Sequence, residues 1–144
     1  MGKQEVTVRR MTEADLQRVK EIDRELAGPH RDVSWPVRIE AHYWVCRGMP
    51  NFVAEVSGEV VGFLLGDIRG VEYGPAIGGW IDMMGVAAQH RSRGIGRKLV
   101  EAFCQECKSR GVKVRVVVVG DDLRLVNFWV SIGFHKGNIV SYEQ

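Results

Sequence analysis

The feature that most constrains this chain is a basic, glycine-containing stretch over residues 91–97, which reads Arg-Ser-Arg-Gly-Ile-Gly-Arg. An apolar run over residues 80–86 precedes it, and a run with helical spacing over residues 98–110 follows it. This order predicts a strand, a turn and a helix. The N-terminus of a helix presents unpaired N–H groups and the positive end of its dipole, while Gly94 and Gly96 let the backbone approach a bulky anion. The stretch is therefore predicted to bind a phosphate or pyrophosphate group.

Two familiar phosphate-binding motifs do not fit this turn. The chain has no Gly-x-x-x-x-Gly-Lys-Ser/Thr run, which a Walker loop requires. Gly94 and Gly96 begin a dinucleotide-type fingerprint, but Leu99 stands where the third glycine is needed for close packing of helix on strand. The chain also has a single strand–turn–helix unit of this kind, so we expect no dinucleotide site.

The composition predicts one globular domain over residues 1–144, because 45% of the residues are hydrophobic and 26% are charged. A net charge of only +2 argues against a nucleic-acid partner. No apolar run is long enough to span a bilayer and residues 1–10 lack the apolar stretch of a signal peptide, so we expect no membrane partner. The three cysteines cannot all pair within the chain, which favours free thiols in a reducing, cytoplasmic setting.

The hydrophobic pattern predicts an α/β domain with a mixed sheet. A first helix, capped at Thr12, has apolar residues at helical spacing and ends at Gly28. Residues 70–79 hold four glycines and a proline and are predicted to form a loop. Strands are expected over residues 5–10, 51–56, 60–68, 80–86, 112–119 and 133–142, and further helices over 34–47, 95–110 and 123–130.

Several segments, in order along the chain, resemble the GNAT superfamily of N-acetyltransferases. Residues 91–96 are similar to the family's Arg/Gln-x-x-Gly-x-Gly/Ala motif, and residues 122–134 to its later Asn-x-x-Ala-x-x-Phe-Tyr-x-x-x-Gly-Phe segment. The stretches 9–16 and 59–63 are also family-like. The resemblance implies a mixed, mostly antiparallel sheet of about six to seven strands flanked by about four helices. It also implies that the fourth and fifth strands splay around coenzyme A (CoA).

The same resemblance implies the reaction and its co-substrate. Acetyl-CoA would donate its acetyl group to a primary amine by direct attack, with no metal ion. The pyrophosphate would lie on the turn over residues 92–97, and the pantetheine arm beside the fourth strand. There a backbone N–H near Val86 would hold the oxyanion, and Gly85 would form a bulge. The implied CoA-binding residues are Met84, Gly85, Val86, Arg91, Ser92, Arg93, Gly94, Ile95, Gly96, Arg97, Asp122 and Trp129.

Asp82 is the candidate catalytic residue, because it is the only acid on the predicted fourth strand. Strand alternation would place Asp82, Met84 and Val86 on one face. A carboxylate beside an apolar acyl site is suited to accept a proton from the amine, directly or through water. A contact with a substrate cation, and a purely structural role, remain open as alternatives.

Two positions depart from the family pattern. Trp129 stands where the family usually has a tyrosine, and an indole N–H cannot protonate a leaving thiolate. Tyr73 and Tyr142 are the candidate substitutes. Asp122 replaces the usual asparagine, with a helix N-cap as its alternative role. These departures leave open a second hypothesis, a catalytically degenerate CoA-binding module with a sensor or regulatory role.

The acceptor is not readable from the sequence. The closest resemblance within the family is to ribosomal-protein N-terminal acetyltransferases, but Val117 and Trp129 replace two of their characteristic residues. The acceptor is therefore left as an unidentified small molecule or protein N-terminus, and the protein as a monomer or homodimer.

Three further patterns have both a functional and a packing interpretation: the aromatic set Trp35, Tyr43 and Trp44, the pair His42 and Cys46, and the pair Cys104 and Cys107. Packing is favoured for both cysteine-containing pairs, so no metal site is expected.

Overall fold

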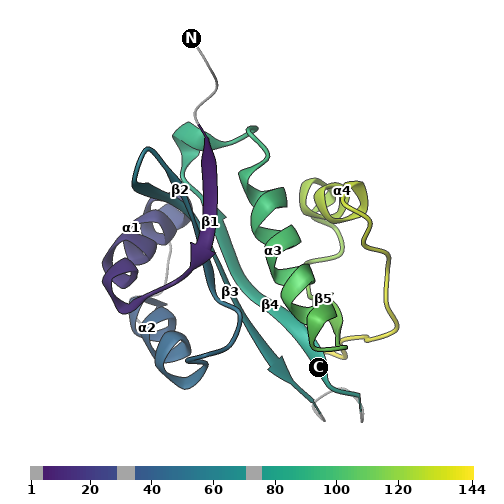
Figure 1. The fold of residues 1–144 in the computed structure, drawn as a ribbon. Helices are drawn as coiled ribbons and strands as arrows, with labels where there is room; N and C mark the ends of the chain where they lie inside the picture. The colour runs from purple at the N-terminus through teal and green to yellow at the C-terminus, as the bar shows by residue number, and fades with distance from the viewer. Residues whose placement is uncertain (1–4, 29–34, 71–75) are drawn as a thin grey trace.

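The computed structural model describes residues 5–28, 35–70 and 76–144, which form a five-stranded sheet between two layers of helices (Figure 1). Helices α1 and α2 cover one face of the sheet, and α3 and α4 lie on the other. The strands are β1 (Val6–Arg10), β2 (Phe52–Val56), β3 (Glu59–Arg69), β4 (Gly78–Val86) and β5 (Lys113–Val116). The helices are α1 (Leu16–Ala27), α2 (Trp35–Val45), α3 (Ile95–Ser109) and α4 (Leu123–Ser131), with short 3₁₀ turns η1 (Glu13–Asp15) and η3 (Ala88–His90).

The strands lie in the order of the chain, from β1 at one edge to β5 at the other. The first three pairings are antiparallel, and β4 pairs with β5 in parallel. The parallel pairing requires a crossover, which α3 provides, since it leaves the end of β4 and returns to the start of β5. The prediction of a mixed, mostly antiparallel sheet with four helices is confirmed.

The predicted number of six to seven strands is wrong for the described residues, and both differences lie after α3. The valine run expected over residues 112–119 stays in the sheet only as far as Val116. Val117 and Val119 are 70% and 68% exposed, so this run is not the strand buried on both faces that its composition predicted. Residues 133–142 form no strand. A strand needs a partner for its N–H and C=O groups, and the short β5 offers little edge for another.

Two hydrophobic clusters hold the helices on the sheet. On one face, Val19 and Ile22 of α1 pack with Phe63 and Leu65 of β3, all at most 1% exposed. On the other face, Phe103 and other apolar residues of α3 pack over β2, β3 and β4. The alternation of β3 between these clusters explains its nearly continuous hydrophobic run, since both of its faces are covered.

The start of α1 is fixed to the sheet by a charged contact. Asp15 accepts hydrogen bonds from the Thr12 backbone N–H, at 2.8 Å, and from both terminal nitrogens of Arg9, each at 2.8 Å. Arg9 also donates to Glu55 of the neighbouring strand at 2.7 Å. The hydroxyl–acid spacing at Thr12 and Asp15 therefore forms the predicted capping box, and the acid of that box also anchors β1.

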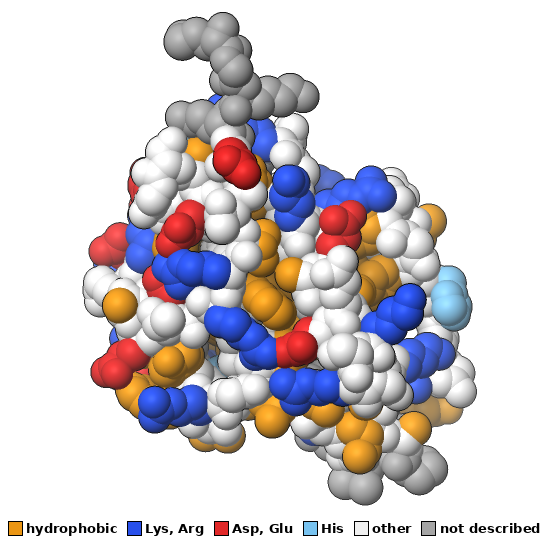
Figure 2. All heavy atoms as spheres, in the orientation of Figure 1, with side chains coloured by type: hydrophobic (Ala, Val, Ile, Leu, Met, Phe, Trp, Pro, Cys, Tyr) orange, Lys and Arg blue, Asp and Glu red, His pale blue; other side chains and the backbone are white. Residues whose placement is uncertain are grey.

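Figure 2 shows a face of the molecule on which lysine and arginine side chains are interspersed with acidic ones. The contacts agree with this mixing, since Arg10 pairs with Glu106 of α3 and Arg18 with Glu59 of β3. In the described part of the chain, no helix has the length and apolar character needed to cross a bilayer.

Candidate active site

The strand β4 contains a bulge at Asp82. In its pairing with β3, Leu65 lies opposite Met83, and the next residue, Gly66, lies opposite Ile81. Asp82 is therefore the extra residue, which bends the strand and increases its twist. The pairing of β4 with β5 ends at the same place, at Ile81 and Val116. From Asp82 onward β4 continues without β5 as its partner. The predicted splay of the fourth and fifth strands around CoA stays a prediction.

The predicted bulge at Gly85 is wrong, because Gly85 pairs in regular register with Phe63. The glycine has a different reason. A Cβ at this position would lie 2.8 Å from a methyl carbon of Leu26 and 2.9 Å from the Phe63 ring. Gly85 therefore lets α1 and its phenylalanine neighbour pack against the backbone of β4.

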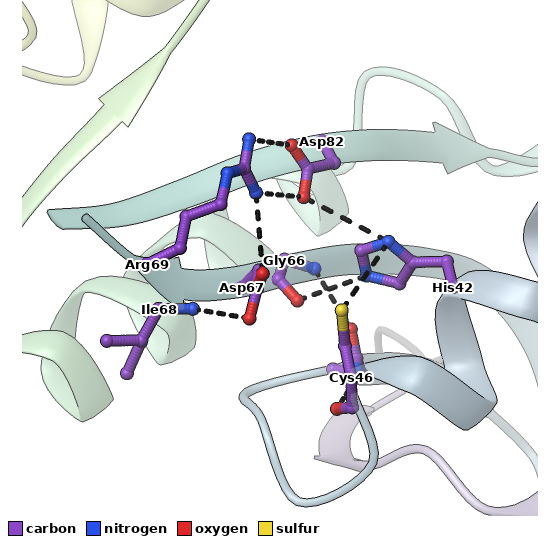
Figure 3. A network of polar contacts seen from close by, with 8 residues as sticks. His42, Cys46, Gly66, Asp67, Ile68, Arg69 and Asp82 are labelled. Carbon is purple, nitrogen blue, oxygen red and sulfur yellow. Dashed lines mark hydrogen bonds and ion pairs between the residues drawn. The ribbon is translucent and has the colours of Figure 1, made fainter. Parts of the chain in front are cut away.

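The bulge also overturns the prediction that Asp82, Met84 and Val86 share one face. Met84 and Val86 pack against the cluster under α3. Asp82 instead reaches toward α2, where His42 lies, as Figure 3 shows. One inserted residue shifts the alternation by one position, so the carboxylate and the two apolar side chains lie on opposite faces of the sheet.

The carboxylate of Asp82 is held by an arginine of the neighbouring strand. Two guanidinium nitrogens of Arg69 donate to the two oxygens of Asp82 at 2.9 and 3.0 Å (Figure 3). Arg69 also lies 3.7 Å from an oxygen of Asp67, and its guanidinium stacks over Trp80. The Asp82 side chain is 24% exposed, so solvent or a ligand still reaches it. A bidentate arginine contact fixes the position of both carboxylate oxygens, which suits Asp82 to anchor a cation.

His42 brings an imidazole from α2 to the same place. Its Nε2 lies 3.1 Å from the carbonyl oxygen of Gly66, and its Nδ1 lies 4.0 Å from Oδ2 of Asp82. The His42 side chain is 11% exposed. Asn51, a buried residue, supports the arrangement by accepting a hydrogen bond from the Gly66 N–H at 2.9 Å and donating to the Cys46 carbonyl at 3.2 Å.

Cys46 lies one helical turn beyond His42 and completes this group of polar contacts. Its Sγ is 4.0 Å from the same Nδ1 atom. Burial raises the pKa of the Cys46 thiol to about 11, and the negative charge of Asp67 adds to this effect. The thiol is therefore protonated at neutral pH, which excludes a reactive thiolate–imidazole pair and supports the packing interpretation. We call His42, Cys46, Gly66, Asp67, Arg69 and Asp82 the Asp82 network.

The basic turn lies at the start of α3, on the other side of β4. Ser92 and Gly94 adopt left-handed backbone conformations, with φ of 62° and 75°, and Gly94 is the N-cap of the helix. A Cβ at Gly96 would lie 3.5 Å from the Phe128 ring and 3.9 Å from the terminal methyl of Met84. The predicted phosphate turn, α4 and the part of β4 beyond its pairing with β5 thus meet in one place. The exposed residues of the turn are Arg91, Ser92, Arg93, Gly94 and Arg97.

Comparison with known families identifies the fold that carries these features. A profile described as the acetyltransferase (GNAT) family matches residues 16–134. The chain belongs to the GNAT family of acetyltransferases. The match includes the Asp82 network, the basic turn and α4. A comparison with functionally curated proteins finds no matching relative.

Solved structures share this GNAT fold across nearly the whole chain. The aminoglycoside N-acetyltransferase AAC(6')-Iy, in complex with the bisubstrate analogue CoA-S-monomethyl-acetylneamine, is 16% identical, with a TM-score of 0.78 and coverage of 97% of this chain and 98% of that chain. Naa50 from Arabidopsis thaliana, in complex with CoA-Ac-MVNAL, is 19% identical, with a TM-score of 0.71 and coverage of 92% and 85%. Ard1 from Thermoplasma volcanium is 23% identical, with a TM-score of 0.75 and coverage of 92% and 84%.

The structure places the two departures from the GNAT pattern on α4. Asp122 is the N-cap of this helix, and its side chain accepts a hydrogen bond from the Leu125 N–H at 3.2 Å. Trp129 is 7% exposed and packs edge-on against Phe128 and Phe134. Phe128, which the sequence analysis did not select, is the α4 residue beside Gly96. The predicted contacts of Asp122 and Trp129 with CoA stay predictions.

The remaining sequence candidates are also placed. Tyr142 is 95% exposed and lies in a segment without regular structure, while Tyr73 falls outside the described residues. Tyr43 packs in the core under α2, whereas Trp44 is 41% exposed. Cys104 and Cys107 are free and lie on α3. Within residues 5–28, 35–70 and 76–144, no three His, Cys, Asp or Glu side chains are grouped as a metal site.

Sequence reasoning missed three members of the Asp82 network, Gly66, Asp67 and Arg69. Arg69 lies on β3 and Asp82 on the neighbouring β4. Their separation of 13 residues in the chain matches neither the helical nor the strand period. Gly66 takes part through its backbone carbonyl, which leaves no trace in the residue type. His42 was noticed for its spacing to Cys46, but its relation to Asp82 depends on the packing of α2 against the bulge.

Proposed function

We propose that this GNAT protein transfers the acetyl group of acetyl-CoA to a primary amine by direct attack, without a metal ion or covalent intermediate. The observation that carries the proposal is the end of the β4–β5 pairing at the Asp82 bulge, with the glycine-containing N-terminus of α3 beside it. The part of β4 beyond this pairing would offer its backbone groups to an extended pantetheine arm. The adjacent turn offers N–H groups and arginines to the phosphates.

The proposed CoA site runs from the turn to the splayed strand. The pyrophosphate would contact the N–H groups of residues 92–97, with Arg91, Arg93 and Arg97 supplying charge. The pantetheine would pass Met84, Gly85 and Val86, and a backbone N–H near Val86 would stabilise the oxyanion of the tetrahedral intermediate. Arg97 is 3.1 Å from Glu101 and both are more than half exposed, so this contact is weak enough to exchange for phosphate.

The acceptor would approach from the other face of β4, where the Asp82 network lies. Analogues of both a small-molecule and a peptide acceptor have been bound on this fold. AAC(6')-Iy was solved with an acetylneamine analogue, and Naa50 with a peptide-bearing one. We therefore propose a small-molecule amine or a protein N-terminus as the acceptor. We further propose that the protein acts in the cytoplasm as a monomer or homodimer, without nucleic-acid or membrane partners.

The proposal is tested with acetyl-CoA and a panel of amines. Acetyl-CoA at 100 times its dissociation constant should stabilise the fold by about 2.7 kcal/mol, seen as a rise in melting temperature. Release of free CoA thiol with at least one amine should then show transfer. Binding without release across a broad panel would favour the sensor or regulatory module instead, and absence of binding would contradict both.

The turn is tested by replacing Arg93 or Arg97 with alanine. Loss of one charge-assisted phosphate contact should weaken acetyl-CoA binding about tenfold, as measured by titration calorimetry. Arg24→Ala is the matched control, since Arg24 is an exposed arginine of α1. If all three variants bind acetyl-CoA with equal affinity, the phosphates do not bind at this turn.

A further inference from the structure

The tautomer of His42 is fixed by the backbone. The Gly66 carbonyl lies 3.1 Å from Nε2, and a carbonyl only accepts hydrogen bonds. The Nε2 atom must therefore carry a hydrogen, and in the neutral imidazole this leaves the lone pair on Nδ1. The carbonyl is itself held in position, because the N–H of the same residue donates to buried Asn51 at 2.9 Å.

The free side of the imidazole faces an acceptor rather than a donor. The Nδ1 atom lies 4.0 Å from Oδ2 of Asp82, a carboxylate oxygen already engaged by Arg69 at 2.9 Å. Two acceptors at this separation do not bond to each other. A single nitrogen with two hydrogens, placed between them, could donate to both at ordinary hydrogen-bond distances. Figure 3 shows both groups directed at the same space between α2 and β4.

The charge of the network matches such a donor. Asp67 and Asp82 carry two negative charges, and Arg69, in contact with both, carries one positive charge. The Cys46 thiol is protonated and adds none. Arg115, a second arginine near this group, lies against the Trp80 ring on β4. The network is thus left with one negative charge, which one alkylammonium group would balance.

We propose that His42 is the proton acceptor of the acetyl transfer, with Nδ1 taking a proton from an alkylammonium group that Asp82 anchors. The proposal rests on the proposed function and narrows its acceptor to a basic aliphatic primary amine. It also assigns different roles to the two side chains: Asp82 positions the ammonium group, and His42 accepts its proton. The roles follow from the contacts, since both oxygens of Asp82 are engaged by Arg69, whereas among the described residues the Nδ1 of His42 has only the Cys46 thiol as a possible donor.

The step balances as follows. The ammonium group gives one proton to Nδ1, and the nitrogen lone pair then attacks the thioester carbonyl. The C–S bond breaks as the carbonyl re-forms, and the second N–H proton passes, directly or through water, to the departing thiolate. The products are the N-acetylated amine, CoA thiol and one proton on His42. Asp82, 4.0 Å away, stabilises the imidazolium until that proton reaches solvent.

The test uses His42→Gln, which separates the roles of the two ring nitrogens. A glutamine amide nitrogen can replace Nε2 as the donor to Gly66, but the side chain has no basic atom at the place of Nδ1. The variant should keep its melting temperature and acetyl-CoA affinity and lose about 10²-fold or more in kcat/KM for an alkylamine. His135→Gln, at an exposed histidine outside the site, is the matched control and should behave as wild type.

A second comparison distinguishes proton transfer from a structural role. Phenethylamine is charged at neutral pH, whereas its isostere O-benzylhydroxylamine is uncharged and needs no deprotonation before attack. With uncatalysed rates subtracted, His42→Gln should cost far less for O-benzylhydroxylamine than for phenethylamine. An equal loss for both, or an unchanged rate with phenethylamine, would overturn the proposal.

His42→Asn gives an independent reading if the glutamine variant folds poorly. Asparagine places an acceptor oxygen near the Nδ1 position but cannot take up a proton, so it should also lose turnover of the alkylamine. Full activity of this variant would reduce His42 to a hydrogen-bond acceptor and overturn its role as base. Failure of the wild-type protein to acetylate any amine would count against the proposed function, whereas a wild-type preference for O-benzylhydroxylamine alone would count against the ammonium site.

Discussion

At Asp82, one extra residue decides which side of the sheet a carboxylate faces. Without the bulge, alternation would place it with Met84 and Val86 under α3, away from His42 and Arg69. With the bulge, the carboxylate lies on the α2 face, while the backbone just beyond it no longer pairs with β5. The same local irregularity thus separates the proposed CoA site from the proposed acceptor site, on the two sides of one strand.

The role of Asp82 predicts the phenotype of Asp82→Asn. The amide removes the charge that anchors the ammonium group and stabilises the imidazolium, so kcat/KM for an alkylamine should fall at least tenfold. Acetyl-CoA affinity should change less than twofold, because the proposed CoA site lies on the other face. Steady-state kinetics and titration calorimetry measure the two quantities on the same preparation.

The matched control for this variant is Glu59→Gln, which also removes a carboxylate paired with an arginine, Arg18, at 3.3 Å. This pair lies at the start of β3, outside the Asp82 network. Unchanged kinetics in Asp82→Asn would show that the carboxylate neither anchors the amine nor accepts its proton. A comparable loss of kcat/KM in Glu59→Gln would show that the change in net charge, rather than the position of the carboxylate, causes the effect.

At the scale of elements, residue periodicity correctly predicted those features that depend on local sequence, such as the ends of helices. Helices α1 and α3 have buried residues at helical spacing and end near Gly28 and Gly111, where the sequence predicted them to end. The register of β3 against β4 depends instead on contacts between distant residues, so the bulge was placed at Gly85 rather than Asp82. The Arg69–Asp82 contact is a consequence of that register and could not be predicted before it.

The close packing of α3 on the sheet gives a prediction at this scale. A Cβ at Gly79 of β4 would overlap the Sγ of Cys107, and it would lie 3.4 Å from Phe103. Gly79→Ala should therefore lower the free energy of unfolding by about 1–3 kcal/mol through overpacking, as measured by urea denaturation. The helix would have to move away from the strand that carries Asp82.

Two further variants separate overpacking from a change in backbone propensity. Gly120→Ala is the matched control, because no atom lies within 4 Å of the added Cβ, and it should leave stability nearly unchanged. Cys107→Ala removes the overlapping sulfur, so the double variant Gly79→Ala/Cys107→Ala should be more stable than the sum of the two single effects. Simple additivity would contradict the packing explanation.

Across the whole molecule, the sequence predicted the layers and the position of the basic turn but not the extent of the sheet. Segments with strong periodicity form the five strands and four helices of the described chain. The two failures lie where the chain has no adequate partner: beyond Val116, and over residues 133–142. Strand formation there depends on a neighbouring edge, which a single-chain hydrophobic pattern does not encode.

The buried thiols predict how the stability of the whole molecule depends on pH. Burial raises the pKa of Cys46 and of Cys107 from 9.0 to about 11 in the folded protein. Between these values the unfolded chain has lost the thiol protons and the folded chain has kept them, so the unfolded state binds fewer protons. The free energy of unfolding should therefore be unaffected by these groups below about pH 9 and fall as the pH rises toward 11. Urea denaturation at several pH values measures this decline. Replacing both cysteines with alanine should make it shallower, whereas an identical decline in that variant would show that other groups cause it.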